Sequence, residues 1–88
     1  MNLNSLTASY VKDVVNFAKK FHLDYARVEF EFNDDIWSCT ISKPKNSIQL
    51  MFYNGDGDFE SMILGKDDKK VIEEFKESKF YKAKIVAE

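Results

Sequence analysis

Acidic side chains are the most conspicuous chemical feature of this sequence, and they gather in its middle part. Several occupy alternate positions, and others flank two turn-like segments: Glu29, Glu31, Asp34, Asp35, Asp56, Asp58 and Glu60. Alternate residues of a strand point to the same side, so carboxylates at this spacing line one face. Carboxylates on an exposed strand face are solvated, so this spacing suits binding of a basic partner better than proton transfer.

The sequence has few residues that could carry out nucleophilic catalysis. Cys39 is the only cysteine and His22 the only histidine. A thiol nucleophile needs a base, and zinc needs a set of four ligands that this pair does not supply. Cys39 alternates with Trp37 and Ile41 on the apolar side of a predicted strand, where burial disfavours the thiolate. We therefore expect no enzyme activity and no cofactor.

Oxygen-bearing side chains at every second position of residues 54–60 are spaced as at the start of a calcium-binding loop. Phe59 stands where such a loop needs glycine, and Gly65 stands where it needs a bidentate glutamate. The sequence around Asn54-Gly55 instead favours a tight turn between two strands. We therefore expect a hairpin here and no metal site.

The composition is that of one globular domain spanning residues 1–88. The chain is 44% hydrophobic and 32% charged, and its net charge is -2. Residues 24–60 hold eight acidic residues against three basic ones, so the acidic charge is concentrated there. No apolar run approaches the roughly 20 residues of a membrane span, and the lone cysteine favours a cytoplasmic location.

Four short segments alternate apolar and polar residues, which predicts half-buried strands at residues 25–33, 36–42, 47–53 and 58–64. Turn-forming residues separate them, including Pro44 and the pair Asn54-Gly55. The predicted inward residues are Val28, Phe30, Phe32, Trp37, Cys39, Ile41, Ile48, Leu50, Phe52, Phe59, Ser61 and Ile63. Met62 and Leu64 make the inward face of the last strand ambiguous.

Segments with helical periodicity lie on either side of these strands. The predicted first helix, residues 7–22, has an apolar stripe made of Tyr10, Val14, Phe17 and Phe21, with Val11 and Ala18 beside it. Residues 68–78 form the predicted second helix, which Asp67 caps. Residues 80–87 alternate again and predict a short edge strand or a continuation of the helix.

These elements predict an α+β domain in the order αββββα, with a possible C-terminal strand. Its antiparallel sheet has three to five strands, and both helices pack on the apolar face. The opposite face then carries carboxylates together with outward-pointing apolar residues: Ile36, Met51, Tyr53, Met62 and Leu64. Apolar residues rimmed by charge are typical of a protein-binding surface.

The segment Gly65-Lys66-Asp67-Asp68-Lys69-Lys70, with the order helix, strands, helix, resembles the double-stranded-RNA-binding domain. The resemblance implies that Lys66, Lys69 and Lys70 contact phosphates of duplex RNA. Asp67 and Asp68 dilute this basic cluster, and the sequence pI of about 5.4 disfavours a phosphate-backbone binder. Direct nucleic-acid binding is therefore the alternative function.

In size, acidity and α+β layout the chain resembles the small phage-encoded anti-defence inhibitors, the anti-CRISPR proteins among them. The resemblance implies a non-catalytic protein that blocks a basic, nucleic-acid-binding surface of an enzyme complex. The predicted partner-binding residues are Glu29, Glu31, Asp34, Asp35, Met51, Tyr53, Asp56, Asp58 and Glu60. A homodimerising adaptor domain, joined through the exposed strand face, is a further alternative, so we expect a monomer or a homodimer.

Overall fold

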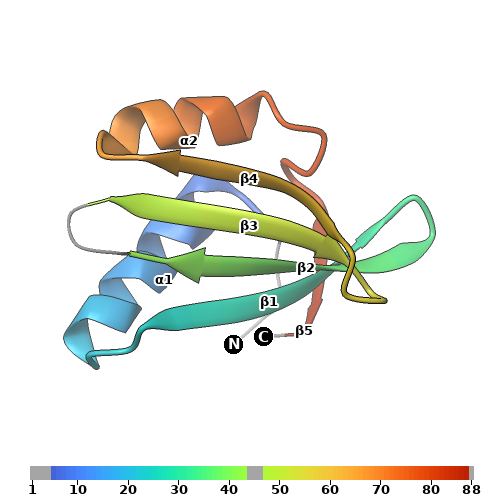
Figure 1. Ribbon diagram of the computed structural model, residues 1–88, viewed down its shortest axis with the longest axis horizontal. Coiled ribbons are helices and arrows are strands. Elements are labelled where there is room, and N and C mark those ends of the chain that lie inside the picture. Colours follow the sequence, from blue (N-terminus) through green and yellow to red (C-terminus); the bar gives the residue numbers. More distant parts are fainter. Residues whose placement is uncertain (1–4, 44–46, 88) are drawn as a thin grey trace.

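Two helices and five strands follow one another in the computed structural model, which describes residues 5–43 and 47–87 (Figure 1). The helices are α1 (Ala8–Lys20) and α2 (Asp68–Lys76). The strands are β1 (Tyr25–Phe32), β2 (Asp35–Ser42), β3 (Ile48–Asn54), β4 (Phe59–Gly65) and β5 (Lys84–Ala87). The predicted α+β class and the element order are confirmed, and the tail supplies the fifth strand.

The strands form one antiparallel sheet in the order β4-β3-β2-β1-β5. Consecutive strands β1 to β4 pair as hairpins, whereas β5 follows α2 in the chain and pairs with β1 at the other margin of the sheet. Both helices pack on one face of this sheet, as predicted, and in Figure 1 the strands lie in front of α1. We call the uncovered face the outer face.

Turn chemistry places two hairpin turns at the same end of the sheet. Asn33 and Asp34 both have positive φ, at 51° and 60°, as a primed two-residue turn requires between β1 and β2. The β3–β4 turn is wider: the Asn54 amide donates to the Asp58 carbonyl at 3.1 Å, and Gly57 has a φ of 89°. We call this end of the sheet the hairpin end. The predicted strand break at Pro44 lies outside the described residues.

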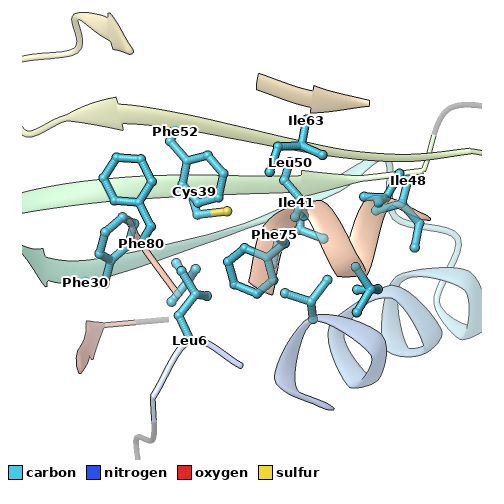
Figure 2. Close-up of a cluster of buried hydrophobic side chains, with 14 of the residues drawn as sticks. Leu6, Phe30, Cys39, Ile41, Ile48, Leu50, Phe52, Ile63, Phe75 and Phe80 are labelled. Carbon is cyan, nitrogen blue, oxygen red and sulfur yellow. The ribbon is translucent and has the colours of Figure 1, made fainter. Parts of the chain in front are cut away.

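A cluster of phenylalanines fills the core between the sheet and the helices (Figure 2). Phe52 from β3 stacks on Phe80 with ring centroids 4.7 Å apart. The Phe52 ring also stacks with Phe75 of α2, with ring centroids 6.2 Å apart. Phe30 meets Phe80 edge-on at 5.5 Å. Large rings fill a small core efficiently, which explains how so short a chain forms a complete hydrophobic core.

The buried face of α1 differs from the prediction. Val11, Val15 and Ala18 face the sheet, whereas Phe17 and Phe21 of the predicted stripe are exposed. Both sets have helical spacing, so periodicity alone did not choose between them. The smaller side chains let the helix lie close to a sheet whose inner face is already crowded with phenylalanine.

Phe59 was predicted to point inward, and that prediction is wrong. The register between β3 and β4 shifts after Phe52, so that Phe52 is opposite Ser61 but Tyr53 is opposite Phe59. This bulge leaves Glu60 as the extra residue and turns Phe59 to the outer face, where it is exposed. The bulge therefore adds an aromatic ring to the surface on which Tyr53 lies.

Candidate protein-binding face

The outer face is built from alternate residues of four strands. Its central strand, β2, contributes Ser38 and Thr40, which are opposite Glu29 and Arg27 of β1 on one side. On the other side, β3 sets Tyr53 opposite Ser38 and Met51 opposite Thr40, and β4 adds Phe59, Met62 and Leu64. The face is thus polar over β1 and β2 and apolar over β3 and β4.

Arg27 organises the polar half. Its Nη2 atom forms a 3.2 Å ion pair with Glu29 Oε1 and donates to Ser38 Oγ at 3.3 Å. Its guanidinium also lies 6.0 Å from the centroid of the Tyr53 ring, and the Tyr53 hydroxyl is 3.0 Å from Thr40 Oγ1. Beneath this network Ser38 is only 2% exposed. Glu29 is therefore neutralised in part by its neighbour, which sequence reasoning did not foresee.

The apolar half is unusually accessible. Phe59 is 60% exposed, Leu64 53% and Met62 46%, while Met51 is half-buried between Thr40 and Met62. The polar side chain of Gln49 lies among these residues and donates to the Met62 sulfur at 3.3 Å. We call Met51, Phe59, Met62 and Leu64 the apolar strip. A contiguous apolar surface of this kind marks an interaction site more often than single exposed residues do.

Four of the predicted carboxylates gather at the hairpin end. Asp34 belongs to the β1–β2 turn, Asp35 is the first residue of β2 directly after it, and Asp56 and Asp58 belong to the β3–β4 turn. Asn54 Oδ1 accepts hydrogen bonds from the amides of Asp56 and Asp58, both at 2.9 Å, which fixes the second turn. We call these four residues the acidic turns.

The two turns are held close to each other by a glycine. An added Cβ at Gly55 would lie 2.7 Å from the carbonyl oxygen of Ile36, so the β3–β4 turn packs directly on the first residues of β2. Two acidic turns on adjacent hairpins therefore act as one electronegative edge beside the outer face.

The remaining predicted carboxylates lie beside lysines of the C-terminal segment. Glu60 forms a 3.2 Å ion pair with Lys79. Glu31 is opposite Lys84 in the register of β1 with β5. Of the nine predicted residues, the structure thus joins Met51 and Tyr53 to the outer face and four aspartates to the hairpin end, while Glu29, Glu31 and Glu60 each have a basic neighbour.

The three lysines of the alternative prediction lie at the opposite end of the molecule. Lys66 follows the end of β4, and Lys69 and Lys70 are exposed in the first turn of α2. Asp67 caps this helix by accepting from the Lys69 amide at 3.0 Å. The C-terminal part of α1 and the end of β2 meet here too, so we call this the basic end.

Positive charge at the basic end is poorly compensated. Lys19 contacts Lys43, and this contact lowers the pKa of Lys43, an effect that Asp68 opposes. A hollow of about 230 Å³ between α1 and α2 is lined by Lys12, Lys19 and Asp68 over apolar residues. The molecule therefore separates its charges along the strand direction, with the acidic turns at one end and these lysines at the other.

Groups that could do covalent chemistry lie apart. Cys39 is fully buried in the core, where desolvation raises the pKa of its thiol from 9.0 to about 12. His22 is exposed just after α1, with a positive φ of 55°. Within residues 5–43 and 47–87, no three His, Cys, Asp or Glu side chains are placed to hold a metal ion.

Fold and surface together define a small α+β domain whose five-stranded antiparallel sheet is covered on one face and presents a partly apolar face on the other. Comparison with protein-family models, with curated proteins and with solved structures finds no match for this chain. No helix in the described part of the chain is long and apolar enough to cross a membrane.

Sequence reasoning missed two residues of this surface. Arg27 was placed on the outward side of its strand but was given no role in binding, although the strand register places it opposite Thr40 and diagonal to Tyr53. Phe59 was assigned to the core. The face of β4 was ambiguous in the sequence, because its apolar residues occupy both alternations, as Ile63 on one and Met62 and Leu64 on the other, but this pattern did not indicate a bulge.

Proposed function

We propose that this protein binds another protein through the outer face and thereby blocks a basic, nucleic-acid-binding surface of that partner. The observation that carries the proposal is the apolar strip lying next to the acidic turns. In this arrangement the apolar side chains provide contact area, and the carboxylates select a basic partner.

The apolar strip and the acidic turns contribute to binding in different ways. Exposed aromatic and methionine side chains lose water on contact and anchor the complex, so they govern its lifetime. The acidic turns act over about 8–10 Å at physiological salt and mainly raise the rate of encounter. Occupation of a phosphate-binding surface by carboxylates needs no catalytic residue, so inhibition would be stoichiometric.

A capture experiment tests the proposal. The full chain, immobilised through a tag, is incubated with lysate of its native host, and bound proteins are identified and their affinity measured with purified components. The double variant Asp34→Asn/Asp56→Asn removes two charges from exposed turn residues, and asparagine tolerates the left-handed backbone at position 34. We expect about tenfold weaker binding, mostly through a slower association rate.

Two further variants complete the design. Met62→Ser/Leu64→Ser removes the apolar anchors and should speed dissociation by at least about tenfold. Lys66→Gln/Lys69→Gln changes charge at the basic end and serves as the matched control, with binding expected within about twofold of the parent. The proposal fails if the captured partner binds all three variants equally well.

RNA binding is the second candidate function, and the cluster of lysines at the basic end favours it. Lys19 and Lys43 in contact with each other form the kind of site that a phosphate would stabilise.

A further inference from the structure

One margin of the sheet is only partly covered. β1 pairs with β2 along its whole length, from Tyr25 to Phe32. On its other side β5 pairs only with Glu29, Phe30 and Glu31, and within the described residues no strand pairs with the part from Tyr25 to Val28. Figure 1 shows β5 beside one end of β1 while the rest of β1 forms the margin of the sheet. A free strand edge is a template for pairing with another chain.

An exposed aromatic flank of α1 lies on the same side. Successive helix residues turn by about 100°, so Tyr10, Val14, Phe17 and Phe21 form a stripe about a quarter turn away from the buried residues Val11, Val15 and Ala18. The first two of this stripe are half-buried, but Phe17 is 54% and Phe21 53% exposed. Their rings are 4.6 Å apart and form one apolar surface.

The residues on the opposite side of α1 show in which direction this flank faces. Lys12 and Lys19 lie about half a turn around the helix from Phe17 and Phe21, and they line the hollow between α1 and α2. The aromatic flank therefore faces away from α2, toward the margin formed by β1. A free edge in the sheet layer and an uncovered apolar flank in the helix layer thus border the same side of the molecule.

We propose that a second copy of this chain docks on this side, with the two β1 edges paired antiparallel about a two-fold axis and the two aromatic flanks of α1 packed against each other. The sheet would then continue from one copy into the other. The outer face stays open on both copies, so the proposal stands independently of the proposed function.

The side is complementary to itself under that symmetry. With Ala26 on the axis, Tyr25 of each copy is opposite Arg27 of the other, which allows a cation–π contact like the one that Arg27 makes with Tyr53 across β2. The same axis makes the two α1 helices antiparallel. A crossing near Phe17 brings Asp13 of one copy close to Lys20 of the other, and both residues are exposed.

The opposite margin of the sheet, formed by β4, is less suited to pairing with a second copy. α2 follows β4 and packs along it, as Figure 1 shows, and Val71 of α2 lies against Gly65, where an added Cβ would be 2.7 Å from its Cγ2 atom. A helix laid along an edge strand is one of the ways in which proteins protect such an edge. Two-fold pairing through β1 is therefore favoured over pairing through β4.

Sedimentation equilibrium of the pure full-length chain tests this proposal. Measured between about 10 µM and 1 mM, the parent protein should change from monomer to dimer, as expected for an interface of modest size. Phe17→Ser/Phe21→Ser should weaken dimerisation at least about tenfold. Met62→Ser/Leu64→Ser, which removes equally exposed apolar residues from the outer face, is the control and should leave the dimer within about twofold of the parent.

A charge exchange keeps the test sharp even if the serine variant folds poorly. Asp13→Lys should weaken the dimer about fivefold, because two symmetry-related contacts become repulsive, and adding Lys20→Asp should restore it. A chain that stays monomeric to 1 mM overturns the proposal. So does a dimer that the outer-face variant dissociates and the α1 variants do not, or a monomer that binds vesicles of phosphatidylserine through Phe17 and Phe21.

Discussion

Cys39 shows how strongly position decides the chemistry of a residue. It belongs to β2, is opposite Val28 and Phe52 on neighbouring strands, and has no solvent exposure. Burial raises the pKa of its thiol to about 12, so the nucleophilic thiolate is absent at neutral pH. Ellman's reagent at pH 8 should therefore label the native protein only as fast as it unfolds, and fast stoichiometric labelling would contradict this placement.

The same thiol predicts a pH dependence of stability. Its pKa is higher in the folded state than in the unfolded state, so the unfolded state loses this proton first as the pH rises above 9. The free energy of unfolding should fall by up to about 1 kcal/mol per pH unit between pH 9 and 12 from this group. Urea titrations of the parent and of Cys39→Ala, which lacks this slope, measure the difference; equal slopes would refute the prediction.

Gly55 holds the acidic turns in place, and its replacement should be costly. An alanine Cβ would meet the Ile36 carbonyl oxygen at 2.7 Å, and a backbone atom cannot move aside as a flexible side chain can. We expect Gly55→Ala to lower the free energy of unfolding by roughly 1–3 kcal/mol. Asp56→Ala, at the next and exposed position, should change it by less than about 0.5 kcal/mol in the same urea denaturation assay. Similar values for the two variants would show that the turn adapts.

At the scale of elements, the sequence predicted the strands well and the faces less well. Alternation located β1, β2 and β3 to within a residue at either end, because each has one apolar set that must be buried. The ends of β4 were also located to within a residue, but the face of Phe59 was predicted wrongly, since a bulge reverses the alternation between Phe59 and Ser61. A bulge depends on the pairing of two strands, so the sequence of one strand does not specify it.

The rotation of α1 was undetermined for a different reason. Its apolar residues cover more than one face, and the larger ones suggested the wrong side. If Val15 faces the core and Phe17 the solvent, Val15→Ala should lower the free energy of unfolding by roughly 1–3 kcal/mol, and Phe17→Ala by less than about 1 kcal/mol. The comparison is made by urea denaturation at concentrations where the chain is monomeric. A larger cost at Phe17 would restore the original prediction.

For the whole molecule, the sequence indicated an acidic sheet but not its polarity. Charges that alternate in the chain become separated in space because all hairpin turns with aspartates fall at one end and the start of α2 falls at the other. The outer face itself is less acidic than predicted, since the Arg27 side chain lies between Glu29 and Tyr53 and Glu60 forms an ion pair with Lys79. Such partners come from strands or segments far apart in the sequence, which periodicity does not connect.

This separation of charge favours the protein-binding proposal over RNA binding. A phosphate backbone approaching the basic end meets Lys66, Lys69 and Lys70, but Asp67 and Asp68 stand among them and the distant acidic turns repel the rest of a long duplex. We therefore expect no mobility shift of a 20-base-pair RNA duplex at about 100 µM protein and about 0.15 M salt. A double-stranded-RNA-binding domain run beside it is the positive control. A shift that Lys69→Gln/Lys70→Gln removes, and that Asp34→Asn/Asp56→Asn strengthens, would assign the basic end to RNA and displace the protein-binding proposal.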